Sequence, residues 1–488
     1  MVTNRVTKEL KKMVTDASEA AKLIMPGMTL GFSGFTLSGD PKVIPQYIEA
    51  GDLTLITSAS VGDKAEGVLC RKGLIKKRYP YQTHSDVRRC INNGEILYSD
   101  IHLSHVPRMI ETGIIDIDYA IIECVKVDDN GIYPTTSVGI SPFLAKYAKN
   151  IILEVNTQIP IEFSEIADIF YAGNAPSANI IPICEATDRV GTTYIPCEIS
   201  KIKAIVFTHE DGTYPQFVPQ DEESDKIAEH IISFLRAELD SNTDLLKNFP
   251  IQSGVGAVAN AVLAGLRGIG IKGLKMYTET MQDTAFELLD EGIIDGISTC
   301  AICLSKAKET VLFDNIDYFK NRIILRPQDI SNSAEVIRRL GVIAMNTPVE
   351  FDIYGNVNST HKLGSNIING IGGSGDFARN SKINIFATKS TAQNGLISCV
   401  VPMVSHCDHT EHDTQIFVTE QGIADLRWKS PKERAEIIIN NCAHPKYKEQ
   451  LWRYYKNAIE KNGNKHTPHD LANAFQMHVN FKKHGSMI

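Results

Sequence analysis

No apolar run in the sequence reaches the ~18–20 residues that a membrane-spanning helix needs. The first residues, Met1–Lys12, are polar, so we expect no secretory signal peptide. Basic residues are not in excess either, because 50 Lys and Arg stand against 58 Asp and Glu, for a net charge of −8. These absences predict no membrane-spanning helix and argue against a general nucleic-acid-binding role.

Cysteine is sparse and scattered, with 10 residues in a chain of 488. Secreted disulfide scaffolds concentrate their cysteines in short chains, so this distribution favours a reducing compartment, and we expect a cytoplasmic protein. The hydrophobic fraction of 43% and the charged fraction of 22% are ordinary for a globular protein. A chain of this length predicts two or three domains with large cores.

Strand-like and helix-like segments alternate along the chain. Continuous apolar runs, such as Ile114–Glu123 and Ile151–Val155, are typical of strands that are covered on both faces of a parallel sheet. The sequence therefore predicts an α/β fold with open, mainly parallel sheets and helices on both faces. A turn-rich, acidic stretch, Thr208–Pro215 followed by Pro219–Asp225, places a domain boundary there and predicts domains 1–220 and 221–488.

The second half of the sequence repeats a pattern of the first half. Leu53–Glu66 resembles Leu274–Glu287, and similar Gly-Leu-Ile and Gly-Ile-Ile segments follow each of them. One α/β unit therefore occurs twice, and such halves commonly bind ligands where they meet. The position of Glu279 in the second copy corresponds to Ser58 or Ala59 in the first, so we expect only the second copy to carry a nucleophile.

Glu279 lies at a predicted strand-to-helix junction. Residues 274–278 alternate as a strand does, and apolar residues recur at helical spacing after Gln282. Open α/β sheets place their chemistry at such strand ends. Two glycine-rich segments, Ser253–Ala257 and Gly370–Asp376, flank Glu279 in sequence, and their backbone N–H groups suit a phosphate or an oxyanion. Each segment alone also fits a simple packing turn, but together with Glu279 they indicate acyl chemistry on a carboxylate.

Three further segments resemble functional sites. Ser405–Asp413 holds three histidines, one cysteine and three carboxylates but lacks the helical His pair of zinc hydrolases, so we expect a polar loop and no metal. Cys300 and Cys303 form a CxxC pair without a second pair, which predicts buried thiols. Glu420, at the end of the strand-like run that begins at Ile416, is the rival catalytic carboxylate.

Several motifs together resemble the class I coenzyme A transferases of the acetyl-CoA hydrolase/transferase type, and among them the succinyl-CoA:acetate CoA-transferases. The resemblance extends over almost the whole chain. It is strongest in Tyr277–Asp283, Asp352–His361, Asn369–Phe377, Val401–His406 and Val418–Leu426. It implies two CoA-transferase domains of the same α/β topology and a homodimer.

The resemblance also assigns roles to individual residues. It implies that Glu279 forms a glutamyl-CoA thioester, that Val255 and Gly373 are backbone oxyanion donors, and that Asn332 is an active-site asparagine. The implied CoA-binding positions are Ser253, Gly254, Val255, Gly256, Ala257, Gly372, Gly373 and Gln393. Gln393 departs from the family, which commonly has a CoA-contacting lysine there, and a neutral glutamine cannot make that ionic contact. In this family the histidine-rich loop is not a metal site.

The sequence therefore predicts an enzyme that moves coenzyme A between a short-chain acyl-CoA, such as succinyl-CoA, and a small carboxylic acid such as acetate. The acyl-CoA is a substrate, and we expect no permanently bound cofactor, nucleic acid or membrane partner. Two alternatives stay open. One is acyl-CoA hydrolysis by the same glutamate, and the other is a non-catalytic nucleotide-binding or regulatory protein.

Overall fold

The computed structural model describes residues 4–173, 175–215, 221–241 and 249–488. The chain forms two compact units: unit 1 comprises Met1–Gln216 and Gly273–Leu340, and unit 2 comprises Phe217–Lys272 and Gly341–Ile488. The segment that carries Glu279 thus groups with the N-terminal part of the chain, although the composition suggested a single division near residue 220. The division into two domains of one topology, 1–220 and 221–488, stays a prediction.

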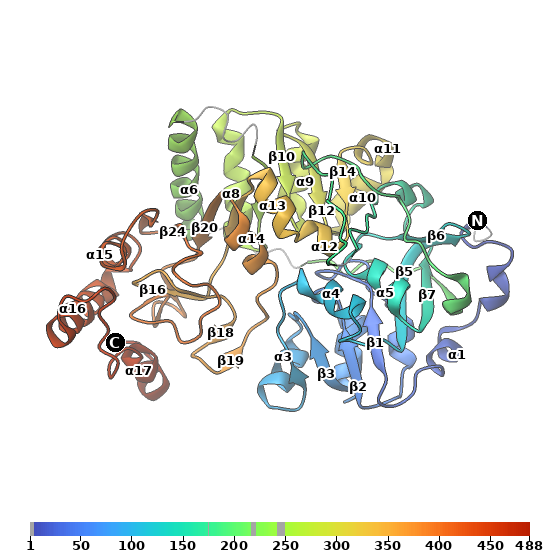
Figure 1. Cartoon of the computed structure of the whole chain (residues 1–488), viewed down its shortest axis with the longest axis horizontal. Helices are drawn as coiled ribbons and strands as arrows, with labels where there is room; N and C mark the ends of the chain where they lie inside the picture. The colour runs from blue at the N-terminus through green and yellow to red at the C-terminus, as the bar shows by residue number, and fades with distance from the viewer. Residues whose placement is uncertain (1–3, 174, 216–220, 242–248) are drawn as a thin grey trace. The chain divides into compact units, whose positions relative to one another are not determined.

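A predominantly parallel sheet organises the N-terminal part of unit 1 (Figure 1). Its strand order is β4-β3-β2-β1-β5-β7-β8, and only β6 pairs antiparallel, with β5. The strands are β1 (Thr29–Phe32), β2 (Leu53–Ile56), β3 (Ile75–Tyr79), β4 (Leu97–Tyr98), β5 (Tyr119–Asp128), β6 (Gly131–Pro134), β7 (Asn150–Asn156) and β8 (Ile202–Thr208). The expected α/β class is confirmed.

The central strands of this sheet are buried on both faces, as their apolar runs predicted. In β7 six of the seven residues are buried. The predicted strand at Ile114–Glu123 begins later, at Tyr119, because Ile114 is 71% exposed and the backbone N–H of Thr29 donates to the Asp118 carboxylate just before the strand. The apolar residues that precede Tyr119 are therefore not part of the strand, because the chain there is exposed to solvent.

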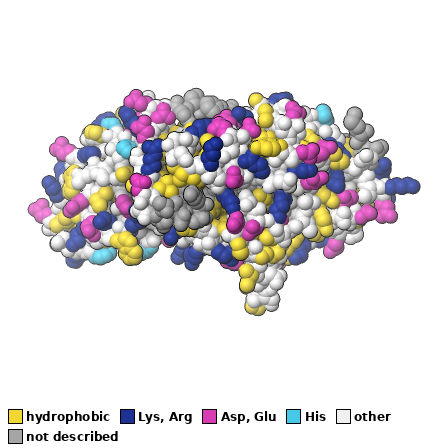
Figure 2. All heavy atoms as spheres, turned by 90° about the horizontal axis from the view of Figure 1, so that it is seen from above, with side chains coloured by type: hydrophobic (Ala, Val, Ile, Leu, Met, Phe, Trp, Pro, Cys, Tyr) yellow, Lys and Arg dark blue, Asp and Glu magenta, His cyan; other side chains and the backbone are white. Residues whose placement is uncertain are grey.

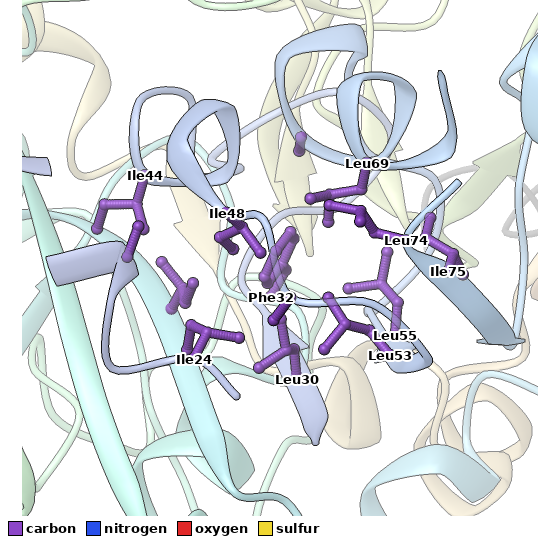
Figure 3. Close-up of a cluster of buried hydrophobic side chains, with 14 of the residues drawn as sticks. Ile24, Leu30, Phe32, Ile44, Ile48, Leu53, Leu55, Leu69, Leu74 and Ile75 are labelled. Atoms are coloured by element: carbon purple, nitrogen blue, oxygen red, sulfur yellow. The ribbon is translucent and has the colours of Figure 1, made fainter. Parts of the chain in front are cut away.

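Short helices cover the strands of unit 1. The α-helices are α1 (Ala17–Ala21), α2 (Val68–Arg71), α3 (Ser85–Asn92), α4 (His105–Glu111), α5 (Ser141–Tyr147), α9 (Asp283–Asp290), α10 (Lys306–Asp314), α11 (Ile316–Phe319), α12 (Gln328–Ser331) and α13 (Ala334–Leu340). Further turns are η2 (Leu10–Met13), η3 (Ile44–Tyr47), η4 (Asp63–Gly67), η5 (Ile161–Glu165) and η6 (Ile199–Lys201). Figure 3 shows Leu30 and Phe32 of β1 and Leu53 and Leu55 of β2 in one buried cluster with Ile44 of η3 and Leu69 of α2.

The second segment of unit 1 repeats the pairing of the first. Strands β10 (Leu274–Tyr277), β12 (Ile294–Thr299) and β14 (Ile323–Leu325) are parallel in the order β14-β12-β10, like β4-β3-β2. Both copies shift register after the first residue, where Leu53 pairs with Ile75 and Leu274 pairs with Ile294. The predicted sequence repeat between residues 53–75 and 274–294 is therefore a repeat of structure. Two short strands, β11 (Thr280–Met281) and β13 (Ala301–Ile302), also pair in parallel.

Unit 2 contains its own parallel strands in the order β9-β15-β20-β24, with β25 antiparallel to β24. These are β9 (Ile251–Ser253), β15 (Ile343–Asn346), β20 (Ile383–Ala387), β24 (Ile416–Thr419) and β25 (Gly422–Asp425). Shorter strands are β16 (Glu350–Asp352), β17 (Val357–Asn358), β18 (His361–Lys362), β19 (Asn366–Ile367), β21 (Thr391–Ala392), β22 (Ile397–Ser398) and β23 (Val400–Val401). The helices are α6 (Glu222–Ser241), α8 (Ala257–Gly265), η7 (Leu266–Ile269), α14 (Ser374–Asn380), α15 (Pro431–Asn441), α16 (Pro445–Asn462) and α17 (Gln476–His484).

The core of unit 2 is rich in aromatic residues. Phe351 and Phe417 lie with their ring centroids 4.3 Å apart, and Tyr447 and Tyr455 of α16 belong to the same buried cluster. A capping box starts α15: the Ser430 side chain accepts from the backbone N–H of Glu433, and the Glu433 side chain accepts from the backbone N–H of Ser430. These helices therefore close the end of the unit that follows β25.

Acidic and basic side chains are interspersed on the face drawn in Figure 2, without a large region of one sign. Among the helices that the structure describes, none is long and apolar enough to cross a membrane. The mixed charge agrees with the balanced composition of the sequence.

Candidate active site

Glu279 follows β10 and is held there by its backbone. Its carbonyl oxygen accepts hydrogen bonds from the N–H groups of Cys300 (2.9 Å) and Ala301 (3.0 Å) and from the Thr299 hydroxyl (3.0 Å). Three donors on one carbonyl fix the turn between β10 and β11. The side chain is half-buried rather than enclosed, so a carboxylate is presented from a rigid support at a strand end, as the sequence predicted.

Asn332 contacts the Glu279 carboxylate directly. Its side-chain Nδ2 donates to Glu279 Oε1 at 2.7 Å. Asn332 is fully buried and caps α12, where its backbone N–H donates to the carbonyl of Gln328 at 2.9 Å. An amide donor on a carboxylate oxygen favours the ionised form and fixes its orientation. The two unit 1 residues that the sequence nominated are thus brought together, although 53 positions separate them.

Tyr277 is a neighbour that the sequence reasoning missed. Its buried hydroxyl donates to the carbonyl of Ile330 in α12. This hydrogen bond joins strand β10, which precedes Glu279, to the helix that ends at Asn332. Burial raises the pKa of Tyr277, which keeps the hydroxyl protonated as a donor. The only signal in the sequence was a tyrosine at the end of the strand, two residues before Glu279.

Val255 lies in the turn between β9 and α8 of unit 2. The side chain is 55% exposed, and among the described residues no acceptor contacts its backbone N–H. Gly254 donates to the carbonyl of Met345 at 3.1 Å, and Gly256 has φ +121°, a conformation that favours glycine. The turn thus presents the Val255 N–H at the start of helix α8, as the sequence predicted for Ser253–Ala257, although its role stays a prediction.

Gly373 precedes helix α14 of unit 2 and is buried. Gly372 adopts φ +58°, so the preceding backbone takes a left-handed turn that a glycine makes readily. Helix α14 packs against β15 and β20. The predicted glycine loop is therefore a tight turn into a helix, and its proposed donation from the Gly373 N–H stays a prediction.

Gln393 lies in the hairpin turn between β21 and β22. It is exposed, and both Gln393 (φ +50°) and Asn394 (φ +55°) adopt left-handed backbone angles. Its carbonyl accepts from the N–H of Leu396 at 3.2 Å. The side chain therefore projects from a tight turn into solvent, and its contact with CoA stays a prediction.

The rival carboxylate, Glu420, is occupied by hydrogen bonds within unit 2. The N–H and hydroxyl of Ser390 donate to its two oxygens, at 2.8 Å for the N–H, and Gln421 Nε2 donates at 2.9 Å. Burial alone would raise the pKa of Glu420, but these donors leave it lowered. A carboxylate with this many donors is stabilised as an anion, which lowers its nucleophilicity. The choice of Glu279 over Glu420 stays a prediction.

The histidine-rich loop forms polar contacts within unit 2. Asp408 accepts from the N–H of Ser359 at 2.6 Å, and His409 Nε2 lies 3.2 Å from the Ser374 hydroxyl. Within the described ranges no group of three or more His, Cys, Asp and Glu side chains is placed to hold a metal ion. The polar loop is confirmed, whereas the absence of a metal stays a prediction. Cys300 and Cys303 are buried thiols, as expected.

Family models match two regions of the chain. The acetyl-CoA hydrolase/transferase N-terminal domain matches residues 2–207, and the C-terminal domain of the same name matches residues 309–455.

Named relatives align over nearly the whole chain. A succinyl-CoA:acetate CoA-transferase of Clostridium kluyveri is 46% identical, covering 98% of this chain and 91% of the relative. A propanoyl-CoA:succinate CoA transferase of Escherichia coli is 42% identical, with 97% and 98% covered. An acetyl-CoA hydrolase of Candida albicans is 40% identical, with 98% and 96% covered. Relatives of both activities are thus similar to this chain.

Solved structures support the fold. RipA from Yersinia pestis superposes with a TM-score of 0.70 at 22% identity, covering 91% of this chain and 97% of that one. A 4-hydroxybutyrate CoA-transferase from Porphyromonas gingivalis gives a TM-score of 0.65 at 20% identity, with 92% and 99% covered. At such identities the likeness concerns the fold alone.

Proposed function

Because the chain belongs to the acetyl-CoA hydrolase/transferase family, we propose that it moves coenzyme A from a short-chain acyl-CoA, such as succinyl-CoA, to a small carboxylic acid such as acetate, through a thioester on Glu279. The observation that carries the proposal is the half-buried Glu279 carboxylate at a strand end, held at 2.7 Å by the amide of buried Asn332.

The first half of the reaction needs a fixed carboxylate. Glu279 attacks the acyl carbonyl carbon, the C–S bond breaks, and an acyl-glutamyl anhydride and CoA thiolate form. The thiolate then attacks the glutamyl carbonyl carbon of the anhydride and displaces the acyl group as a free acid. Asn332 holds Oε1 of Glu279 and thereby orients the carboxylate for the attack. Fixing the reactants can supply ~7–11 kcal/mol of the barrier.

The second half reverses these bonds with another acid. The incoming carboxylate attacks the glutamyl-CoA thioester, CoA thiolate leaves, and the thiolate attacks the acyl carbon of the new anhydride. Glu279 is released as a carboxylate, and no proton is gained or lost overall. No permanently bound cofactor is required, because the glutamate carries the CoA.

Each tetrahedral intermediate places negative charge on an oxygen that needs donors. We assign this role to the backbone N–H groups of Val255 and Gly373, which lie in turns at the starts of α8 and α14. One such donor typically contributes about 10²–10³ in rate. The segment Ser253–Ala257 and Gly372 would contact the CoA, with Gln393 supplying a neutral contact in place of a lysine. A cytoplasmic homodimer completes the proposal, following the resemblance and the scattered cysteines.

Hydrolysis is the second candidate, because relatives named acetyl-CoA hydrolase are about as similar as the transferases. It uses the same glutamate but lets water reach the thioester. Exclusion of water is what preserves the thioester for transfer.

Two measurements test the proposal. Incubation with acyl-CoA alone, followed by borohydride reduction and peptide mapping, is expected to place a covalent modification on Glu279 and none in a Glu279→Gln variant. Glu291→Gln, at an exposed position after α9, is the matched control and keeps the adduct. CoA release is then followed with and without acetate. Release that needs no acceptor acid would establish hydrolysis, and an adduct on Glu420 or a cysteine would reject the assignment of Glu279.

A further inference from the structure

Unit 1 contains a cavity of about 220 Å³ that the proposed reaction does not use. Its walls come from four parts of unit 1: α4 with Ser104 before it, Phe143 of α5, a third set of residues (Ala172, Gly173, Ala178, Asn179 and Ile181), and Asp329 with Ser333–Glu335. Glu279 and the proposed CoA-binding residues are not among its described lining residues. The volume is below the ~300–1,000 Å³ of pockets for drug-sized ligands, so its occupant is a small molecule.

The walls of the cavity are tied together by the fold. The guanidinium of Arg339, on α13, donates to the carbonyls of Ile181 (2.5 Å) and Ile183 (3.0 Å). The hydroxyl of Tyr171 donates to the carbonyl of Pro142 at 2.9 Å, and α4 packs against both α5 and α12. The cavity is therefore preformed rather than a gap between loose loops.

Two carboxyl groups of the cavity make no close ion pair with a described residue, although the charge of Arg108 acts on Asp329 from a distance. Asp329 Oδ1 is buried and has no hydrogen-bond partner among the described residues. Glu111 accepts from the Tyr147 hydroxyl at 2.8 Å, and among the described residues it forms no ion pair with a Lys, Arg or His. A buried polar atom without a partner is costly, so a cationic donor placed between these two groups would be stabilised.

One cation of the cavity lacks an anion. Arg108 projects from α4 at the exposed side of the cavity, and its guanidinium makes no ion pair or side-chain hydrogen bond within the part of the chain that the structure describes. It lies on the same helix as Glu111, one turn away, yet it does not pair with that carboxylate. The remaining wall is apolar, with Pro107, Phe143 and Ile181.

We propose that this cavity binds a small apolar α-amino acid, with its ammonium group between Asp329 and Glu111 and its carboxylate at Arg108. The apolar side chain then packs against Phe143 and Ile181. A plain carboxylic acid would leave the two carboxyl groups without a close cationic partner, and a plain amine would leave Arg108 without a close anionic one. A zwitterion satisfies both in one molecule.

The cavity lies next to the residue that orients Glu279, so a bound ligand can affect the proposed nucleophile. Asp329 and Ser333 line it on either side of Asn332 in sequence, and Asn332 holds Glu279. A ligand that contacts Asp329 therefore acts on the short helix that orients the proposed nucleophile. This consequence rests on the proposed function, whereas binding itself does not.

Calorimetry with three matched ligands tests the binding. L-Leucine carries both charges, 4-methylpentanoate lacks only the ammonium, and 3-methylbutylamine lacks only the carboxylate. Leucine is expected to bind at millimolar concentration or better, and each truncated ligand about tenfold more weakly or worse, since each lacks one charged contact. No heat from leucine, or equal binding of either truncated ligand, would overturn the proposal.

Variants locate the binding in the cavity. Arg108→Gln is expected to weaken leucine about fivefold or more, while Arg89→Gln, an exposed arginine of α3 outside the cavity, leaves it unchanged. Asp329→Asn removes the ammonium partner, with circular dichroism as a check of folding. Leucine binding that survives Arg108→Gln intact would show that the heat comes from another place and would reject the cavity as its site.

The pH dependence of leucine binding tests whether Asp329 is ionised in the complex. Burial, together with the nearby Glu111 charge, raises the pKa of Asp329 to about 7. An ammonium ligand pairs with the ionised carboxylate, so leucine affinity is expected to rise as the pH rises through about 7 and then to level off. The ionisable groups that act on Asp329 are Arg108 and Glu111 of α4, Tyr171, Tyr277 and Cys300, and His105 and Glu335 line the same cavity. Asp329→Asn must abolish the rise, and affinity that falls with pH would contradict the proposed pairing.

A turnover measurement separates the two claims. With saturating leucine, the rate of adduct formation on Glu279 is expected to change in the wild type and to stay constant in Arg108→Gln. An unchanged wild-type rate, with leucine bound, would reject the effect on Glu279 and keep the site. Absence of any adduct on Glu279 would instead reject the proposed function.

Discussion

The turn after β2 and the turn after β10 share a backbone but differ in what their side chains do. Thr57 and Thr278 hold equivalent places, and their N–H groups donate to Tyr79 (3.2 Å) and Ser298 (2.9 Å) in the next strand of each copy. One position further, Ser58 is fully buried whereas Glu279 is half-buried. A repeated framework thus supports two different uses.

The first turn serves the packing of unit 1. Ser58 Oγ accepts a hydrogen bond from the N–H of Ile140 at 2.8 Å. Gly139, at φ +51°, lies so close that an added Cβ would come within 1.9 Å of Ser58 Oγ. The second turn instead leaves its side chain partly open and gives it an amide partner, Asn332. The repeat supplies a rigid strand end, and the side chain together with its access to solvent determines whether chemistry follows.

Replacing Glu279 by Ala should have the largest effect. We expect transfer to fall to background, because no other group of the turn can form the thioester, while the unfolding midpoint in urea stays close to that of the wild type. The half-buried side chain supports little core. Glu291→Ala, after α9, is the control with normal turnover. Transfer that persists in Glu279→Ala would remove the functional difference between the two turns.

Glu279→Asp tests how closely the second turn positions its carboxylate. The change withdraws the carboxylate by one methylene, against a near-attack distance of about 3–3.5 Å, where a 1 Å error can cost about 10²-fold. We therefore expect about 10²-fold slower transfer with acyl-CoA binding retained. Slow hydrolysis is expected to appear, because room opens for water and the carboxylate can act as a general base. Near wild-type transfer would make Glu279 a positioning group and Glu420 the nucleophile to test.

Asn332→Ala removes the partner that distinguishes the second turn from the first. A hydrogen bond to a charged group is worth about 1.5–3 kcal/mol, so we expect adduct formation on Glu279 to slow by roughly 10–10²-fold. Single-turnover mass spectrometry measures this rate. Asn315→Ala changes another helix-capping asparagine of unit 1, which is exposed, and should leave the rate unchanged. Equal rates in the two variants would mean that the 2.7 Å contact does not act on the nucleophile.

Local sequence patterns predict the strand and the helix on either side of Glu279. The alternation at residues 274–278 and the helical spacing after Gln282 place β10 and α9, and the repeat between Leu53 and Leu274 is visible from side-chain types alone. Strand ends are encoded within a few residues, so reasoning from periodicity finds them. Periodicity alone therefore places Glu279 at the junction between β10 and α9, without information on tertiary contacts.

The partners of that carboxylate are not encoded locally. Asn332 reaches Glu279 because β14 pairs with β12 and α12 then folds back, and Tyr277 ties α12 to β10 from within a strand. These contacts depend on pairing across about fifty residues, which spacing does not reveal; Asn332 was nominated only by the family resemblance. The cavity beside α12 has no sequence signature, because its lining comes from four separate segments.

Ser58→Ala is the smallest change and the sharpest contrast with Glu279. Loss of the hydroxyl leaves the N–H of Ile140 buried without its acceptor, which costs about 1–3 kcal/mol. We therefore expect a lower free energy of unfolding in urea, by that amount, with unchanged transfer per folded molecule. Ser200→Ala, at an exposed position of η6, is the control and should alter neither quantity. If Ser58→Ala instead slowed transfer without lowering the free energy of unfolding, the turn after β2 would take part in the chemistry. The two turns would then not differ in function as proposed.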